Sequence, residues 1–320
     1  MFENLMFSLN STMPLFMIMV LGYLLFKKGF LTEAFITVAN RFVYNVTLPV
    51  MLFRDLAEMD IRSSFDAKYV GFCAFATISS ILVIWLFCHL LLKDKQIIGE
   101  FVQACYRSSA AILGTAFILN IYGTSGMSGM MILGSVPLYN IFAVLILTLE
   151  SPEGKGRSVS LSSKLRDSLI KITRNPTLIA IAFGILASIL HLPIPVMFSK
   201  AMSSLGSMTS PLALLAIGAG FRGSAALAKI KPTIAASVIK LLVLPGVFLP
   251  LAVKLGFLDQ KLVALLVMLG SITTPSAYVM AKQMGHDGTL TGSVCAATTL
   301  FSSVTLTLWL FWAKVNGYIL

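Results

Sequence analysis

Two cationic side chains lie deep inside apolar segments of this chain. Arg107 and Lys240 each stand roughly nine residues from the start of an apolar stretch, which places them about 13 Å along a helix. A charge at that depth in a membrane costs roughly 2.5–3.5 kcal/mol and usually marks a substrate or ion pathway. Snorkelling or pairing with backbone carbonyls would also explain both residues. As binding residues, they would be charge partners of an anion.

Small hydroxylated residues interrupt two apolar stretches, one of which contains Arg107. Such runs let two broken helices cross closely at the middle of a membrane. The N-termini of the half-helices would then present N–H groups and positive dipole ends to an anion. The candidate binding residues in these runs are Arg107, Ser108 and Ser109 in the first, and Thr273, Thr274, Pro275 and Ser276 in the second.

Two further stretches share the pattern polar-x-Thr-x-Pro, or a close variant of it. A proline removes one backbone hydrogen bond of a helix and leaves polar backbone that hydrocarbon cannot satisfy but a ligand cavity can. A kink absorbed by packing would explain one such proline, whereas a pair at corresponding positions favours a binding cavity. The candidate residues are Asn45, Thr47 and Pro49, then Thr209, Ser210 and Pro211.

These motifs belong to an internal duplication. Helix-breaking residues of the first half recur 162 positions later in the second half, with no insertion between them. Each lies in an apolar segment, so the duplicated unit is a bundle of membrane helices. The matched pairs are Pro14 with Pro176, Gly22 with Gly184, Pro49 with Pro211, and Gly123 with Gly285.

The composition predicts an all-α polytopic membrane protein. Of the residues, 57% are hydrophobic and only 12% charged, more apolar than a soluble domain of this size could cover. The apolar stretches have the length of membrane-spanning helices, not that of barrel strands. We predict ten transmembrane helices, five per repeat, near residues 11–26, 35–53, 69–92, 98–121, 127–149, 176–192, 196–221, 233–255, 262–284 and 290–315.

The loop charges predict an orientation. Fourteen loop lysines and arginines fall on one side of this topology and seven on the other, so the richer side is cytoplasmic and both termini are external, in a cell membrane. An odd number of spans per repeat makes the second repeat insert upside down. The predicted organisation is repeat 1 over 1–150, a cytoplasmic linker over 151–174 and repeat 2 over 175–320.

The sequence lacks residue patterns that several classes of binding site require. The middle of each predicted span is free of Asp and Glu, which a cation antiporter would need. The four cysteines have no metal-ligand spacing, so we expect no metal and no cofactor. The basic residues flank membrane segments and do not form a patch with aromatics, so we expect a bilayer partner and no nucleic acid.

The chain resembles the auxin efflux carrier family, which includes plant PIN proteins and bacterial malonate- and malate-type permeases. The resemblance implies a five-plus-five inverted repeat with crossed fourth and ninth helices and elevator-type transport of small carboxylates. It also implies a scaffold of spans 1, 2, 6 and 7, a moving body of spans 3–5 and 8–10, and a homodimer. It is carried by Asn40-Arg41-Phe42-Val43 with Pro49 and Phe53, Arg107-SSAAIL-Gly114, Arg174-Asn175-Pro176, Pro211-LALLAI-Gly218, Lys240-LLVL-Pro245 and Tyr278-VMAKQM-Gly285.

Three other functions fit the sequence less well than a secondary carrier. An intramembrane enzyme would need a buried nucleophile with a base, and the chain has neither GxSxG nor a histidine at a span centre. A receptor or scaffold with the same fold would need a sizeable soluble output domain. A pump would need a nucleotide site such as GxxxxGK[ST], which the sequence lacks.

Overall fold

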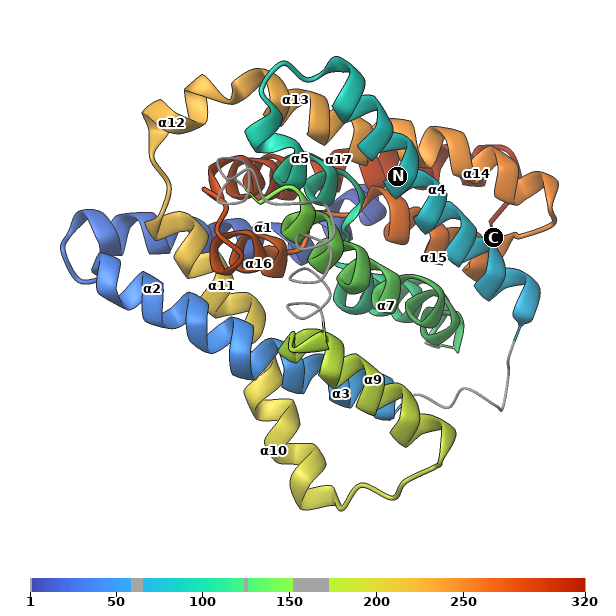
Figure 1. The fold of residues 1–320 in the computed structure, drawn as a ribbon. Helices are drawn as coiled ribbons and strands as arrows, with labels where there is room; N and C mark the ends of the chain where they lie inside the picture. Colours follow the sequence, from blue (N-terminus) through green and yellow to red (C-terminus); the bar gives the residue numbers. More distant parts are fainter. Residues whose placement is uncertain (1, 59–65, 124–125, 152–172, 320) are drawn as a thin grey trace.

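The structure, a computed structural model, describes residues 2–58, 66–123, 126–151 and 173–319 (Figure 1). Over these ranges the chain is helical and contains no β-strand longer than an isolated bridge. The elements are α1 (Phe2–Lys27), α2 (Glu33–Phe42), η1 (Val43–Thr47), α3 (Leu48–Ala57), α4 (Ala67–Leu91), η2 (Lys95–Ile97), α5 (Ile98–Tyr106), η3 (Ala110–Gly114), α6 (Thr115–Tyr122), α7 (Gly126–Leu149), α9 (Pro176–Ile189), α10 (Val196–Ser207), α11 (Thr209–Ala219), α12 (Gly223–Ala228), α13 (Ile230–Val238), η5 (Ile239–Val243), α14 (Leu244–Lys254), α15 (Asp259–Gly270), α16 (Pro275–Gln283) and α17 (Thr289–Val315).

Seven helical stretches in the described residues are long and apolar enough to cross a membrane. The expected spans over 98–121 and 262–284 are not among the seven, because each is divided into two shorter helices. The first residue of the sixth expected span, Pro176, begins α9, a shorter apolar helix. The multi-pass membrane class is therefore confirmed, while the count of ten crossings stays a prediction.

The helix starts follow from local side-chain chemistry. Asn175 caps α9 by accepting from the N–H groups of Thr177 and Leu178, and Pro176 occupies the first helical position, where its missing N–H costs nothing. The cap of α17 comes from another helix. The buried carboxylate of Glu100 in α5 accepts from the N–H groups of Gly288 and Thr291 at 3.0 Å, which satisfies N–H groups at the start of α17.

The helices form two packing groups, and Figure 1 shows α3, α9 and α10 of the first group on the opposite side of the fold from α4, α13 and α14 of the second. In the first group, α1 packs along α11, and α3 packs along both α9 and α10. In the second, α4 packs against α5 and α7, α17 against α13 and η5, and α14 against α15. Helix α1 also runs along α17 and so joins the two groups.

Glycines allow the closest approaches within the first group. A Cβ at Gly22 in α1 would lie 2.4 Å from the carbonyl oxygen of Leu215 in α11, and one at Gly184 in α9 would lie 2.9 Å from that of Phe53 in α3. Helix backbones at that separation exclude any side chain.

One prediction falls outside the described residues. The linker predicted over 151–174 lies almost wholly in the range 152–172.

Candidate functional site

Two helix interruptions meet inside the second packing group. Helix α5 ends at Tyr106 and η3 begins at Ala110, while α15 ends at Gly270 and α16 begins at Pro275. Ser108 and Thr273 form an isolated antiparallel bridge across these breaks. Beside it, the Ser109 N–H donates to the carbonyl of Ile272 at 3.1 Å. The two interrupted stretches thus satisfy part of each other's backbone, and we call the residues 107–109 and 271–274 the crossing.

Lys240 lies on one side of the crossing, its core face. The side chain is fully buried and reaches from η5, where its Nζ donates to the carbonyl of Tyr106 at 3.0 Å and to the Ser108 hydroxyl. Ser108 in turn donates to the carbonyl of Met268. The cation therefore sits at the C-terminal end of α5, where the helix dipole is negative and the last carbonyls lack helical partners.

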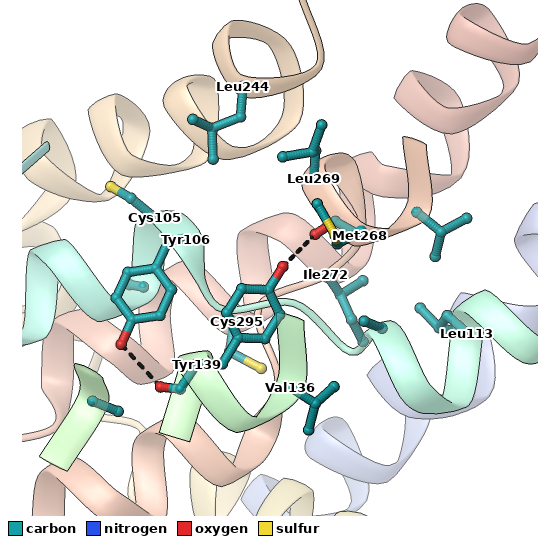
Figure 2. Packing of buried hydrophobic residues seen from close by; sticks show 14 of the residues in the cluster. Cys105, Tyr106, Leu113, Val136, Tyr139, Leu244, Met268, Leu269, Ile272 and Cys295 are labelled. Atoms are coloured by element: carbon teal, nitrogen blue, oxygen red, sulfur yellow. Dashed lines mark hydrogen bonds between the residues drawn. The ribbon is translucent and has the colours of Figure 1, made fainter. Parts of the chain in front are cut away.

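Two tyrosines hold the same region, as Figure 2 shows. The Tyr106 hydroxyl donates to the carbonyl of Tyr139 at 3.1 Å, and the Tyr139 hydroxyl donates to the carbonyl of Met268 at 2.9 Å. Both rings are buried among apolar side chains of α7, α15 and η3. These bonds link α5, α7 and α15 at the point where the helical ladders are broken.

A small cavity of about 40 Å³ lies beside the crossing, on what we call the cavity face, and Lys240 is not part of its lining. Its walls come from both packing groups. Helices α3 and α11 of the first group form one wall, and the crossing and α7 of the second group form the other. The lining residues are Leu48, Met51, Leu52, Arg107, Ser108, Ser109, Ala110, Ala111, Val136, Tyr139, Asn140, Thr209, Ser210, Thr274 and Ser276.

Arg107 supplies the charge of this cavity. Its guanidinium donates to Asn140 Oδ1 at 2.6 Å, to Ser276 Oγ at 3.3 Å and to Met280 Sδ. All three acceptors are neutral, and in the described part of the chain no carboxylate pairs with Arg107 or Lys240. A guanidinium has five N–H donors, so Arg107 keeps donor capacity and a full positive charge beside the cavity.

The cavity volume limits what fits. A cavity needs roughly 10–15 Å³ to hold one water, so the space of about 40 Å³ admits a few waters or one small polar group. A carboxylate end group approaches this size, but a whole dicarboxylate exceeds it. A larger cargo would require α3 and α11 to move away from the crossing.

The structure brings together half of the predicted binding residues. Those that line the cavity are Arg107, Ser108, Ser109, Thr209, Ser210, Thr274 and Ser276.

The other predicted residues lie elsewhere. Asn45 is exposed and donates to the carbonyl of Arg41 in its own helix. Thr47 is buried and accepts from the Thr209 hydroxyl at 2.9 Å. Thr273 hydrogen-bonds to α5 and α17 within the crossing, where its hydroxyl donates to the carbonyl of Ala104 at 2.8 Å. Pro49, Pro211 and Pro275 each lie in the first turn of a helix, and Lys240 lies on the core face.

Sequence reasoning missed the contribution of α7. Asn140 accepts from Arg107 and donates its amide N–H to the carbonyl of Val136 at 2.9 Å, which fixes the acceptor oxygen toward the cavity. An amide in the apolar stretch 127–149 is a signal that could have found it, because polar side chains in membrane helices usually serve a bond or a pathway.

Two polar openings lie at the far end of α16 from the crossing. One of about 320 Å³ is lined by residues that include Asn40, Arg222 and Tyr278, and one of about 640 Å³ by residues that include Tyr44 and Arg174. Both share Lys282 and Gln283, and α16 runs from these residues to the crossing at Pro275.

A family model for membrane transport proteins matches residues 7–310 of the chain. The chain therefore belongs to this family, that of auxin efflux carriers and PIN-like proteins, and is a multi-pass membrane transporter. The family is one of transporters and not of enzymes. No curated protein matches the chain in sequence.

Proposed function

We propose that this protein is a secondary carrier of small organic anions and that it binds their carboxylate at the cavity face of the crossing. The observation that carries the proposal is Arg107, a buried cation that lines a cavity and has only neutral partners among the described residues. A buried charge is stabilised when an opposite charge joins it. Arginine suits a carboxylate because its planar donors match the two oxygens.

Contacts between repeat-related residues support the inverted repeat. Thr47 and Thr209 are 162 positions apart, equal to the repeat offset, and their hydroxyls are hydrogen-bonded. Equivalent residues that touch each other lie at a two-fold axis. Gly22 against Leu215 and Gly184 against Phe53 are likewise one contact repeated, because each residue of the first pair matches one of the second at that offset. Ten membrane-spanning segments in two inverted sets of five would have this two-fold symmetry.

The two packing groups suit an elevator mechanism. The first group, α1–α3 with α9–α11, would be the scaffold, and the second would carry the crossing as a moving body. The cavity lies between them, lined by Leu48 and Thr209 on one side and Arg107 on the other. Movement of one group past the other would enlarge the cavity and expose it to alternate sides of the membrane.

The openings at the end of α16 would be the cytoplasmic entrance. They carry Arg174, Arg222 and Lys282, three of the loop cations that the positive-inside rule assigns to the cytoplasm. Arg222 pairs with Glu33, and Asp287 also lines the smaller opening. Arg174 and Lys282 are therefore the cations that would raise the local concentration of an anion. This assignment leaves both chain termini on the external side.

Uptake into proteoliposomes tests the function. Radiolabelled malonate, malate and indole-3-acetate would be offered under imposed voltage and pH gradients to the wild type and to Arg107→Gln. Arg41→Gln, a change at an exposed arginine that lines neither the cavity nor the two openings, is the matched control. We expect saturable flux that Arg107→Gln abolishes and Arg41→Gln largely keeps. Wild-type protein that binds none of these anions and moves none under any gradient would favour a receptor role.

A further inference from the structure

A long groove lies on the membrane-facing side of the second packing group, away from the crossing cavity. It has a volume of about 850 Å³ and runs between α4 on one side and α13, η5 and α14 on the other. Residues at helical spacing along α4 form one wall, among them Val83, Phe87 and Leu91. Ala235 and Val247 belong to the facing wall.

The walls are apolar and open outward. Phe87 is 52% exposed, Leu91 73% and Val247 56%, although all three lie in helices long and apolar enough to span a membrane. The two wall hydroxyls, Ser79 and Ser80, donate to carbonyls of their own helix. The groove surface therefore offers hydrocarbon contact along its length, and its contents would be in touch with the bilayer.

The two ends of the groove differ. At one end the helices close on each other, since Phe75 stacks edge to face on Phe248 at 6.4 Å and Lys68 donates to the carbonyl of Leu255. At the other end the lining includes Lys229, Lys231 and Asp94.

The charges at the open end leave one lysine available. Lys229 pairs with Asp287 at 2.7 Å, and the Asp94 carboxylate accepts from the N–H of Gln96 at 2.9 Å. Lys231 is exposed and makes no ion pair or hydrogen bond with another described residue. Lys93 and Lys95 lie in the same turn as Asp94, so the rim of the groove is basic.

The length of the groove matches one leaflet. The α4 wall runs from Ser79 to Leu91, about 18 Å at 1.5 Å per residue. One leaflet of the hydrocarbon core is about 15 Å thick. An acyl chain that entered beside Lys231 would reach the closed end, with its headgroup at the level of the lysines.

From this combination we propose that the groove is a binding site for an anionic phospholipid, which places one acyl chain between α4 and α13–α14 and its phosphate at Lys231. Apolar walls, a single open end and a basic rim match the two parts of such a lipid. The site is independent of the carrier function, because it shares no lining residue with the cavity at the crossing.

The test compares lipids added to the purified full-length protein in detergent. Thermal unfolding would be followed with increasing dioleoylphosphatidylglycerol, dioleoylphosphatidylcholine and, as a headgroup without chains, glycerol 3-phosphate. We expect saturable stabilisation by phosphatidylglycerol at lower concentration than by phosphatidylcholine, and none by glycerol 3-phosphate. Lys231→Gln should weaken the phosphatidylglycerol response about fivefold, the effect of one lysine near an anionic headgroup.

A second variant tests the part of the groove that would hold the acyl chain. Ala235→Phe fills the groove and should remove the preference for phosphatidylglycerol, whereas Ile234→Phe, at a neighbouring exposed position outside the lining, should keep it. Equal stabilisation by the two lipids, or an unchanged preference in both Lys231→Gln and Ala235→Phe, would show ordinary annular lipid and overturn the proposal. Stabilisation by glycerol 3-phosphate alone would overturn it in favour of a simple anion site.

Discussion

The two buried cations of the crossing lie close in the fold but have opposite surroundings. Lys240 has its charge directed at the carbonyl of Tyr106 and the Ser108 hydroxyl on the core face. Arg107 lines a cavity, and its partners there, such as Asn140 and Ser276, are neutral side chains from other helices. The first cation completes the broken backbone, and the second has capacity for a ligand.

This difference separates structure from function within one motif. A charge in a membrane protein requires compensation, and Lys240 receives it from the C-terminal end of α5, which is a permanent part of the fold. The compensation of Arg107 is incomplete, because side-chain acceptors without charge stabilise a guanidinium less than a carboxylate does. Loss of Arg107 should therefore affect binding first, and loss of Lys240 should affect folding first.

Arg107→Gln should give the largest effect. We expect the affinity for a carboxylate cargo to fall about 30-fold or more, because loss of one partner of a buried charge pair costs about 2–5 kcal/mol. Arg107→Lys should recover part of the affinity, since it keeps the charge and loses the planar set of donors. Titration of the purified protein with the carboxylate that the flux assay identifies, followed by calorimetry, measures both.

Equal affinity for the carboxylate in the wild type and Arg107→Gln would contradict the binding role of Arg107. Arg107 would then be a structural cation like Lys240, and the cavity would bind through Ser109 and Thr274 or not at all.

Lys240→Met should act on stability. It leaves the Tyr106 carbonyl without its buried donor, which costs about 1–3 kcal/mol. Chemical unfolding in mild detergent measures the loss. If the variant is as stable as the wild type, another donor reaches Tyr106 and the structural role assigned to Lys240 is wrong.

The adjacent serines repeat the comparison on a smaller scale. Both serines line the cavity, but the Ser108 hydroxyl also donates to the carbonyl of Met268 and accepts from Lys240. Ser108→Ala should reduce stability by about 0.5–1.5 kcal/mol, the ordinary net contribution of a hydrogen bond. Ser109→Ala should leave stability unchanged and weaken cargo binding by a similar free energy. The two substitutions remove the same hydroxyl group, so they can be compared directly. If Ser108→Ala weakened only binding and Ser109→Ala reduced only stability, the two serines would have the opposite roles.

The sequence predicted the positions of the helix breaks at the crossing better than it predicted the side-chain contacts of the two cations. Runs of small hydroxylated residues and the repeat offset indicated which stretches would break, and Ser108 and Thr273 do meet. The sequence could not tell which cation faces a cavity, because that depends on side chains from distant helices. Asn140 lies 33 positions after Arg107, and Met280 lies 173 positions after it. Periodicity within one helix carries no information on such contacts.

A third cation, Lys261, has a carboxylate partner, which neither buried cation has among the described residues. It pairs with Asp66 at 2.6 Å at the start of α4, outside the expected spans. The hydrogen bond from Lys261 and the Tyr69 backbone N–H together lower the pKa of Asp66. A carboxyl with a lowered pKa stabilises the fold above its ordinary pKa, about 3.9, and loses that contribution as the pH falls through the lowered value.

Asp66→Asn tests this last case. The amide oxygen can still cap α4, so only the ion pair is lost, and partly exposed pairs contribute about 0.2–1 kcal/mol. We expect the variant to be slightly less stable than the wild type at neutral pH, and the difference to shrink as the pH falls below the ordinary Asp pKa of about 3.9, by thermal unfolding in detergent. A difference that does not shrink as the pH falls would assign the effect to the cap and not to the charge. The crossing cations should show no such acid-dependent loss, because in the described chain they have no carboxylate to protonate.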